Sequence, residues 1–439
     1  MSQRLQRKRM KRFGMNKVGL AGCLLKLSDN LLSFKINCIF GLICCGYLTN
    51  TNLFYMKKLS LILVSCAVLF ACNKPEEKGT PLTPEEQKTK IEDTAIELMD
   101  ACDAADFKEF VDLGKYISDT YFSNEDYDYT AVLTKFMDWY DLFYTEGVSN
   151  DKLVIVLSQV TGEFNFGPTK VTYREADNLK LKIKDEQNRE CVLDLVTSGS
   201  ETAVTYIKDG NELTVKVPQN IKLTLKRDAE TLATFSFVFD LKLSDQINPS
   251  KDRIGVKSTL NVKAYSLQAN ILYDGANNQI SSDGTLSKNG KMLISENLDG
   301  VVKLTGDDID NVGFENASGN ISLDFLGSVQ VKGAISDFLK LYTELNIYDD
   351  NSEASATEAA AKVNSLVSLS LYYDRTTTKQ AHIEFECVKD YEYYEVMPVI
   401  VFNDGSRYLF DEYFNEENFS RLVSRFEEFI QSYQELLGN

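Results

Sequence analysis

The sequence contains very little histidine and, over most of its length, very little cysteine. His382 is the only histidine in 439 residues, so a zinc site or serine triad built on histidines is excluded or severely impaired. After residue 72 only Cys102, Cys191 and Cys387 occur, which excludes a dense disulfide framework but leaves open whether two of them pair. Apolar neighbours at helical or strand spacing predict buried thiols at Cys102 and Cys387. The hydrophobic core must therefore supply the stability.

The chain is also poor in positive charge. Residues 1–71 hold 11 of the 47 basic residues and one of the 65 acidic residues, so the remainder carries 36 basic and 64 acidic residues, a net charge of −28. Repulsion from phosphates opposes binding to nucleic acid, and we expect no such partner. Phosphate-binding loops and G-x-S-x-G or H-E-x-x-H motifs are absent after residue 71, and nothing in the sequence indicates a cofactor.

What the sequence does contain is a secretory signal that begins at Met56. Two lysines follow this methionine, and then come the apolar run from Leu59 to Ala71, Cys72 and a polar segment rich in Lys, Glu and Pro. The apolar run is too short to span a bilayer as a stable helix. This layout is typical of a signal peptide over residues 56–71, followed by a flexible tether over 72–82. The alternative is a buried apolar strand that ends in cysteine.

The last residues of this signal, Leu69, Phe70, Ala71 and Cys72, resemble the lipobox of bacterial lipoproteins. In that motif a leucine and a small residue precede an invariant cysteine. The resemblance implies cleavage between Ala71 and Cys72, and lipidation of Cys72 by chains such as palmitate, which would anchor the protein in a membrane. Asn73 in place of aspartate implies the outer membrane, on its periplasmic or surface face. The following Lys-Pro-Glu-Glu is similar to the export tags of surface lipoproteins.

The segment before the signal differs in composition from the rest of the chain. Residues 1–55 carry nine Lys or Arg against Asp29 alone, and they lack clean hydrophobic periodicity. We interpret them as an extension upstream of the true start. A membrane segment around residues 36–48 is the alternative, although that piece is too short to span a bilayer.

Hydrophobic periodicity predicts an α+β fold for residues 83–439, which we expect to form one large domain. Helical spacing dominates residues 83–150, beginning with a capping box at Thr83 and Glu86. Period-two alternation dominates 151–439, where helices also occur, and predicts a long antiparallel meander with a covering helical layer. A change of alternation predicts a β-bulge near Ala264 and Tyr265. An amphipathic helix is expected at the C-terminus.

Three groups of residues could carry chemistry, and each also has a structural interpretation. His382 alternates with apolar residues, which places it beside Glu384 and Glu386 on one face of a strand. It could act as a base or a metal ligand, or it could simply be a solvated strand residue. The oxygen-rich stretch with Asp307, Asp308 and Asp310 could hold calcium, but it fails the EF-hand pattern and also fits a polar turn. The third group consists of two acids and two aromatic residues of one predicted helix: Asp138, Trp139, Tyr140 and Asp141. The acids could serve a glycosidase, with a sugar stacked on the aromatic residue, or the group could belong to an ordinary amphipathic helix.

These observations leave three hypotheses for the folded part. The first is a non-enzymatic lipoprotein that binds a polymer, lipid or protein partner. The second is a lipid carrier resembling the LolA and LolB type, with an apolar cavity beneath a curved sheet; the alternating apolar residues from Phe235 to Leu243 favour it. The third is a hydrolase that uses carboxylates.

Overall fold

The period-two alternation corresponds to a large β-sheet, which we describe from a computed structural model. The model describes residues 80–124, 126–145, 152–208, 211–245, 248–305, 313–341, 352–390 and 393–438, all within the compact unit Val68–Asn439. The predicted lipobox with Ala71 and Cys72, and the calcium candidates Asp307, Asp308 and Asp310, lie outside the described residues. In the part that is described, no helix is both long and apolar enough to cross a membrane.

The sheet is built as a meander. Its strands are β1 Tyr144–Thr145, β2 Lys152–Val156, β3 Gly162–Phe166, β4 Val171–Arg174, β5 Leu179–Lys184, β6 Glu190–Lys208, β7 Asn211–Arg227, β8 Glu230–Lys242, β9 Arg253–Val262, β10 Tyr265–Asp274, β11 Gln279–Lys288, β12 Lys291–Thr305, β13 Gly313–Phe325, β14 Val329–Ile335, β15 Val367–Tyr373, β16 Ala381–Asp390, β17 Tyr393–Phe402 and β18 Arg407–Leu409. From β5 to β18 each strand pairs antiparallel with the next one along the chain. The pairs β2–β7 and β3–β5 are parallel.

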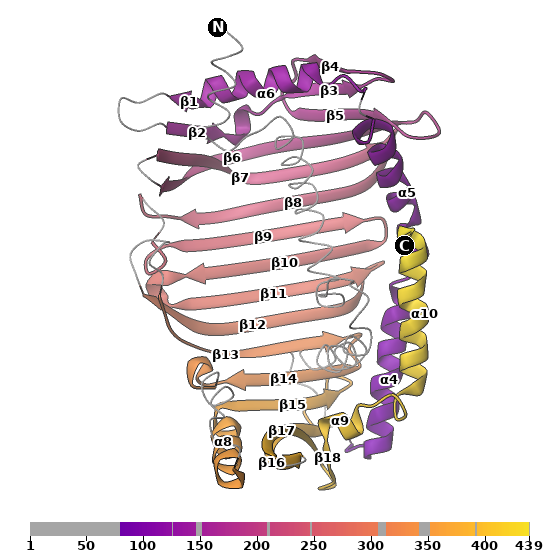
Figure 1. Ribbon diagram of the computed structural model, residues 1–439, viewed down its shortest axis with the longest axis vertical. Coiled ribbons are helices and arrows are strands. Elements are labelled where there is room, and N and C mark those ends of the chain that lie inside the picture. The colour runs from indigo at the N-terminus through magenta and orange to yellow at the C-terminus, as the bar shows by residue number, and fades with distance from the viewer. Residues whose placement is uncertain are drawn as a thin grey trace. The chain divides into compact units, whose positions relative to one another are not determined.

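Helices precede, interrupt and follow this meander (Figure 1). They are α4 Pro84–Ala101, η1 Ala104–Phe107, α5 Lys108–Ile117, η2 Ser118–Phe122, α6 Thr130–Phe143, η3 Leu157–Gln159, η4 Gly275–Asn277, α8 Glu353–Leu366, α9 Phe410–Tyr413 and α10 Ser420–Leu437. The α+β class, the N-terminal helices, the antiparallel meander and the C-terminal helix are thus confirmed.

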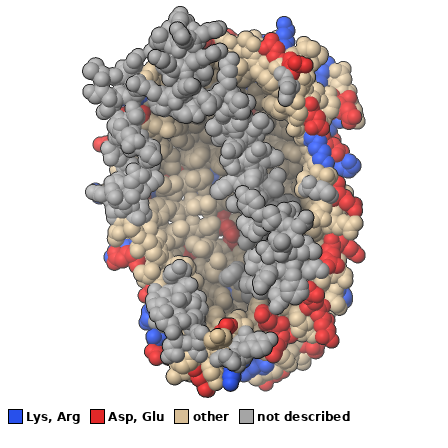
Figure 2. Space-filling view, in the orientation of Figure 1, with Lys and Arg blue, Asp and Glu red and all other residues tan. Residues whose placement is uncertain are grey.

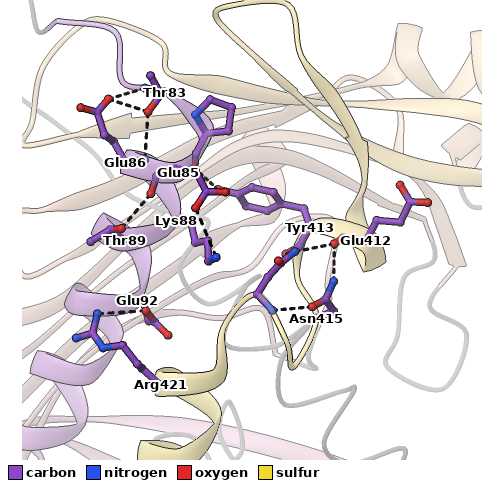
Figure 3. A network of polar contacts seen from close by, with 12 residues as sticks. Thr83, Glu85, Glu86, Lys88, Thr89, Glu92, Glu412, Tyr413, Asn415 and Arg421 are labelled. Carbon is purple, nitrogen blue, oxygen red and sulfur yellow. Dashed lines mark hydrogen bonds and ion pairs between the residues drawn. The ribbon is translucent and has the colours of Figure 1, made fainter.

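Helix α4 begins where the sequence indicates, and it packs against α9 and α10. The Thr83 hydroxyl accepts from the amide of Glu86, whose side chain accepts from the amide of Thr83, so the predicted capping box is present (Figure 3). Tyr413 donates to the carbonyl of Pro84 at 2.8 Å, and the buried Glu92 accepts from the amide of Leu422 at 2.9 Å. These bonds connect α4 to α9 and α10.

Helices α4, η1 and α5 follow one border of the sheet, where alternate hairpins of the meander end (Figure 1). We call these three elements the helix border. Their contacts to the hairpins combine apolar packing, such as Leu113 of α5 with Leu232 and Phe107 of η1 with Tyr265, with ion pairs and hydrogen bonds. The bonds are Lys90–Asp374 at 2.6 Å, Glu97–Lys291 at 2.7 Å, Asp106–Lys288 at 2.6 Å, Glu109–Lys263, Glu109–Arg227, and Tyr265 to the carbonyl of Ala101 at 2.8 Å.

One prediction about the meander is wrong. The change of alternation near Ala264 is not a bulge but a two-residue hairpin turn between β9 and β10, with Val262 opposite Tyr265. Such a turn keeps both residues on the same face, so the apolar positions switch from even to odd numbers. Lys263 takes the positive φ of 49° that a tight turn requires, where glycine or asparagine is more usual. The turn therefore lacks its common sequence signature.

Candidate functional site

One face of the sheet is apolar across many strands, and it is the most extensive feature that could bind a ligand. Three rows of cross-strand neighbours define what we call the apolar face. The first row is Leu195, Leu223, Phe235, Leu260, Leu267, Leu286, Ile294, Phe325, Val329 and Tyr373, from β6 to β15. At about 4.8 Å per strand this row extends for about 43 Å.

The second and third rows lie beside the first, two residues apart along each strand. The second row is Thr197, Ile221, Phe237, Ser258, Ala269, Gly284, Glu296, Leu323, Val331, Leu371, Ala381 and Phe402. The third row is Phe239, Val256, Ile271, Ser282, Leu298, Ile321, Gly333, Leu369, Ile383 and Ile400. Neighbouring aromatic rings touch on β8, with centroids of Phe235 and Phe237 at 4.1 Å.

The apolar face is covered at its two ends. Near β3 and β5, Phe164 and its neighbours pack with Trp139 of α6 and Tyr121 of η2. At the other end, Val363 and Leu366 of α8 are buried with residues that continue the face, among them Phe385. Between β14 and β17 the described residues line a recess of about 10 Å³, enough for about one water molecule.

The middle of the apolar face is different, because its side chains are only half-buried. Every member of the three rows between β6 and β12 is half-buried or exposed, and Ile271 keeps 52% of its surface accessible. The described contacts of the helix border with β8–β12 involve residues near the hairpins, such as Lys263, Tyr265 and Lys291. Figure 2 shows the surface hollowed over the strands, with mostly uncharged atoms on the floor of the hollow.

The opposite face of the same strands is polar. Between the apolar positions, β10 to β12 carry Gln268, Asn270, Asp283 and Asp299, together with several serines and threonines. This difference between the faces follows from strict alternation, since successive side chains of a strand point to opposite sides. The sheet therefore has one face suited to water and one suited to an apolar ligand.

A single charged side chain lies in the three rows. Glu296 is exposed and has Gly284 and Leu323 as its cross-strand neighbours. Its carboxylate accepts a hydrogen bond from Ser282 Oγ at 3.3 Å. Sequence reasoning missed this residue, although the alternation of Ile294, Glu296 and Leu298 in one strand was a sufficient signal.

The three cysteines after residue 72 are free thiols in the structure. Cys191 is fully buried, and Cys102 and Cys387 are half-buried. Burial raises the pKa of the Cys102 and Cys191 thiols to about 11, so neither provides a reactive thiolate near neutral pH.

His382 shares a face with Glu384 and Glu386, as its alternation predicts, and the group is completed by an arginine. His382 Nε2 lies 2.9 Å from Glu384 Oε1, and Arg407 donates to Glu384 at 2.7 Å and also to Glu386. Hydrogen bonds from Arg407 and His382 lower the pKa of the Glu384 carboxyl. This arrangement is an ion-pair network on the polar face.

The aromatic and acidic residues of α6 point in different directions. Asp138 and Asp141 are exposed, whereas Trp139 contacts Phe136 and Phe164 with ring centroids 6.1 and 6.2 Å apart. The tryptophan thus belongs to the cluster beneath α6 and is not displayed beside the acids as a platform for a sugar.

We also searched the described residues for groups that could hold a metal ion, and compared the chain with known proteins. In the described ranges, no group of three or more His, Cys, Asp or Glu side chains is arranged to hold a metal ion. Comparisons with protein-family models, with curated proteins and with solved structures find no match. The apolar face with its single carboxylate therefore carries the functional argument.

Proposed function

We propose that this chain is a lipid-anchored lipoprotein of the outer membrane whose domain binds an apolar ligand, such as the acyl chains of a lipid, on the apolar face. The half-buried middle of the apolar face is the observation that carries this proposal. The middle of the apolar face extends over six strand spacings of about 4.8 Å and two row spacings of about 6.8 Å, which gives an area of about 400 Å². Apolar patches of that size on a soluble domain are often binding sites.

One further observation, and the predicted anchor, support a carrier or binding role over a hydrolytic one. The described acidic groups that the sequence singles out are paired in a network or exposed on a helix, so they do not converge on the apolar face. The anchor at Cys72 rests on the lipobox resemblance, and it would hold the domain close to a source of acyl chains. Binding energy would come from apolar area removed from water, at about 25 cal/mol per Å² before the costs of association.

The binding role is tested with two variants that are matched for residue type and exposure. Ile271 lies on the apolar face and is 52% exposed, and Val301 lies on the polar face and is 49% exposed. We expect Ile271→Asp to weaken binding of the apolar dye phenylnaphthylamine, and Val301→Asp to leave it unchanged. Equal effects of the two variants, or no binding by the wild-type protein, would contradict the proposed role.

The anchor is tested separately by mass spectrometry of the protein purified from membranes. We expect an N-terminus at Cys72 that carries acyl chains, and its loss in Cys72→Ser. An unmodified N-terminus at Met1 or Met56 would refute lipidation without affecting the binding experiment.

A further inference from the structure

We infer that the ligand of the apolar face carries an amino group that pairs with Glu296. This inference rests on the proposed function and adds the chemical class of the ligand, a lipid with a primary amine in its polar part. Three observations carry it: the place of Glu296 in the face, the room made for its side chain, and the absence of a cation beside it among the described residues.

Glu296 lies within the apolar face and not at its rim. It belongs to the second row, with the apolar first and third rows on either side. Its neighbours along β12 on this face are Ile294 and Leu298, and both are half-buried. A carboxylate surrounded by apolar side chains loses part of its hydration whenever a ligand covers the face, and this loss costs free energy unless a partner replaces the water. A ligand without a hydrogen-bond donor at this point would therefore bind less well.

The neighbouring strand makes room for this side chain. A Cβ atom at Gly284 would lie 2.8 Å from Cγ and 2.9 Å from Oε1 of Glu296, so the glutamate side chain lies across the glycine. Ser282 on the same strand donates to Oε1 at 3.3 Å and holds the carboxylate there. Together Gly284 and Ser282 hold the Glu296 carboxylate close to the sheet, where a ligand that lies along the rows would contact it.

No cation is found beside Glu296 among the described residues. Other acids of the described sheet, such as Asp324, Glu163 and Asp274, form ion pairs with arginine or lysine. The hydrogen bond from Ser282 occupies one lone pair of Glu296 and leaves the other acceptor sites for a ligand. A primary ammonium group has three donors and complements this charge.

The dimensions fit an amphiphile that lies across the strands. From Glu296 on β12 the second row runs past Gly284, Ala269 and Ser258 to Phe237 on β8, a distance of about 19 Å at about 4.8 Å per strand. The small side chains beside Glu296 give way to the phenylalanines of β8 at the far end. We therefore place the amine at Glu296 and the acyl chain toward Phe237.

The experiment compares three probes that share one alkyl chain: dodecylamine, dodecanol and dodecanoate. Each is used to displace phenylnaphthylamine from the wild-type protein and from two variants. Glu296→Gln removes the negative charge from the apolar face. Asp299→Asn removes one negative charge from the same strand but on the opposite face, so it controls for net charge and for any change in β12.

We expect dodecylamine to bind the wild-type protein about tenfold more tightly than dodecanol, and dodecanoate to bind most weakly. Glu296→Gln should abolish the preference for the amine, and Asp299→Asn should retain it. Equal binding of amine and alcohol to the wild-type protein, or equal effects of both variants, would overturn this inference and leave the binding of apolar ligands intact. Failure of all three probes to displace the dye would overturn the inference together with the proposed binding role.

Discussion

The ion pairs of Glu109 in the helix border give a stability prediction that can be worked out from the structure. Glu109 accepts from both Lys263 and Arg227, and its own side chain is 36% exposed. Arg227 is only 6% exposed and has one other carboxylate partner, Glu230, at 3.1 Å. Replacing Glu109 by Gln therefore leaves the buried guanidinium with one carboxylate partner among the described residues, and this partner is itself 59% exposed.

The size of the effect lies between two limits. Removing one partner of a fully buried ion pair costs about 3–5 kcal/mol, whereas a fully exposed pair contributes about 0–1 kcal/mol. Because Arg227 is buried and Glu109 is about one-third exposed, we expect Glu109→Gln to lower the free energy of unfolding by about 2 kcal/mol.

The matched control lies on the same helix border. Glu97 pairs with Lys291 at 2.7 Å, but the two side chains are 55% and 63% exposed. Glu97→Gln removes the same charge from the same border, and we expect it to cost less than about 0.5 kcal/mol. Urea unfolding followed by the fluorescence of Trp139 measures both variants. If Glu109→Gln destabilises the protein no more than Glu97→Gln does, the buried arginine is not held by Glu109 and the reasoning fails.

The same variant should also change the response to acid. Hydrogen bonds from Lys263 and Arg227 lower the pKa of the Glu109 carboxyl below its ordinary value of 4.5. A lowered folded-state pKa contributes stability above the unfolded-state pKa, and this contribution is lost as the pH falls through the folded-state value. The difference between the wild-type protein and Glu109→Gln should therefore be largest near neutral pH and shrink below about pH 4.

Two further predictions concern backbone strain and thiol reactivity. Gly162 has a φ of 130°, and a Cβ there would collide with the Tyr173 ring, so Gly162→Ala should cost about 2–3 kcal/mol in urea unfolding. Gly290 has a φ of 78° and nothing within 4 Å of a Cβ, so Gly290→Ala should cost about 1 kcal/mol. Equal costs would refute the steric explanation. Cys191 is fully buried, so iodoacetamide at about pH 8 should leave it unmodified in the folded protein and alkylate it in urea, with the half-buried Cys387 as the internal control. Alkylation of native Cys191 as fast as Cys387 would contradict its burial.

The sequence was sufficient to predict those parts of the fold that depend on neighbours along the chain. The capping box at Thr83 and Glu86 is local, and the alternation from Phe235 to Leu241 depends on one strand only. The turn at Lys263 and Ala264 was missed because a lysine occupies the left-handed position, where a short-range signal would need glycine or asparagine.

The helix border could not be predicted, because its partners are distant in the sequence. Glu109 and Lys263 are separated by 154 residues, and each alone is an ordinary surface charge in an acidic chain. The apolar face was predicted in one strand, but its extent was not. Only the register of the whole meander shows that the apolar positions of ten strands form one continuous row. Glu296 was overlooked for a different reason: its alternation with Ile294 and Leu298 was visible in the sequence, but the apolar strands on both sides of it were not.

In this fold the bonds of the helix border contribute to stability, whereas the apolar face is the surface that we propose binds the ligand. A helical layer packed over the middle strands would gain stability by burying the apolar face, but it would also occupy the surface that binds the ligand. Here α4, η1 and α5 contact the hairpins through side chains such as Asp106 and Glu109, whose partners Lys288 and Lys263 are not members of the three rows. Glu109→Gln should therefore lower stability without changing the affinity for phenylnaphthylamine, and Ile271→Asp should do the reverse. If both variants lose affinity for phenylnaphthylamine, the ligand is held by the helix border and not by the apolar face alone.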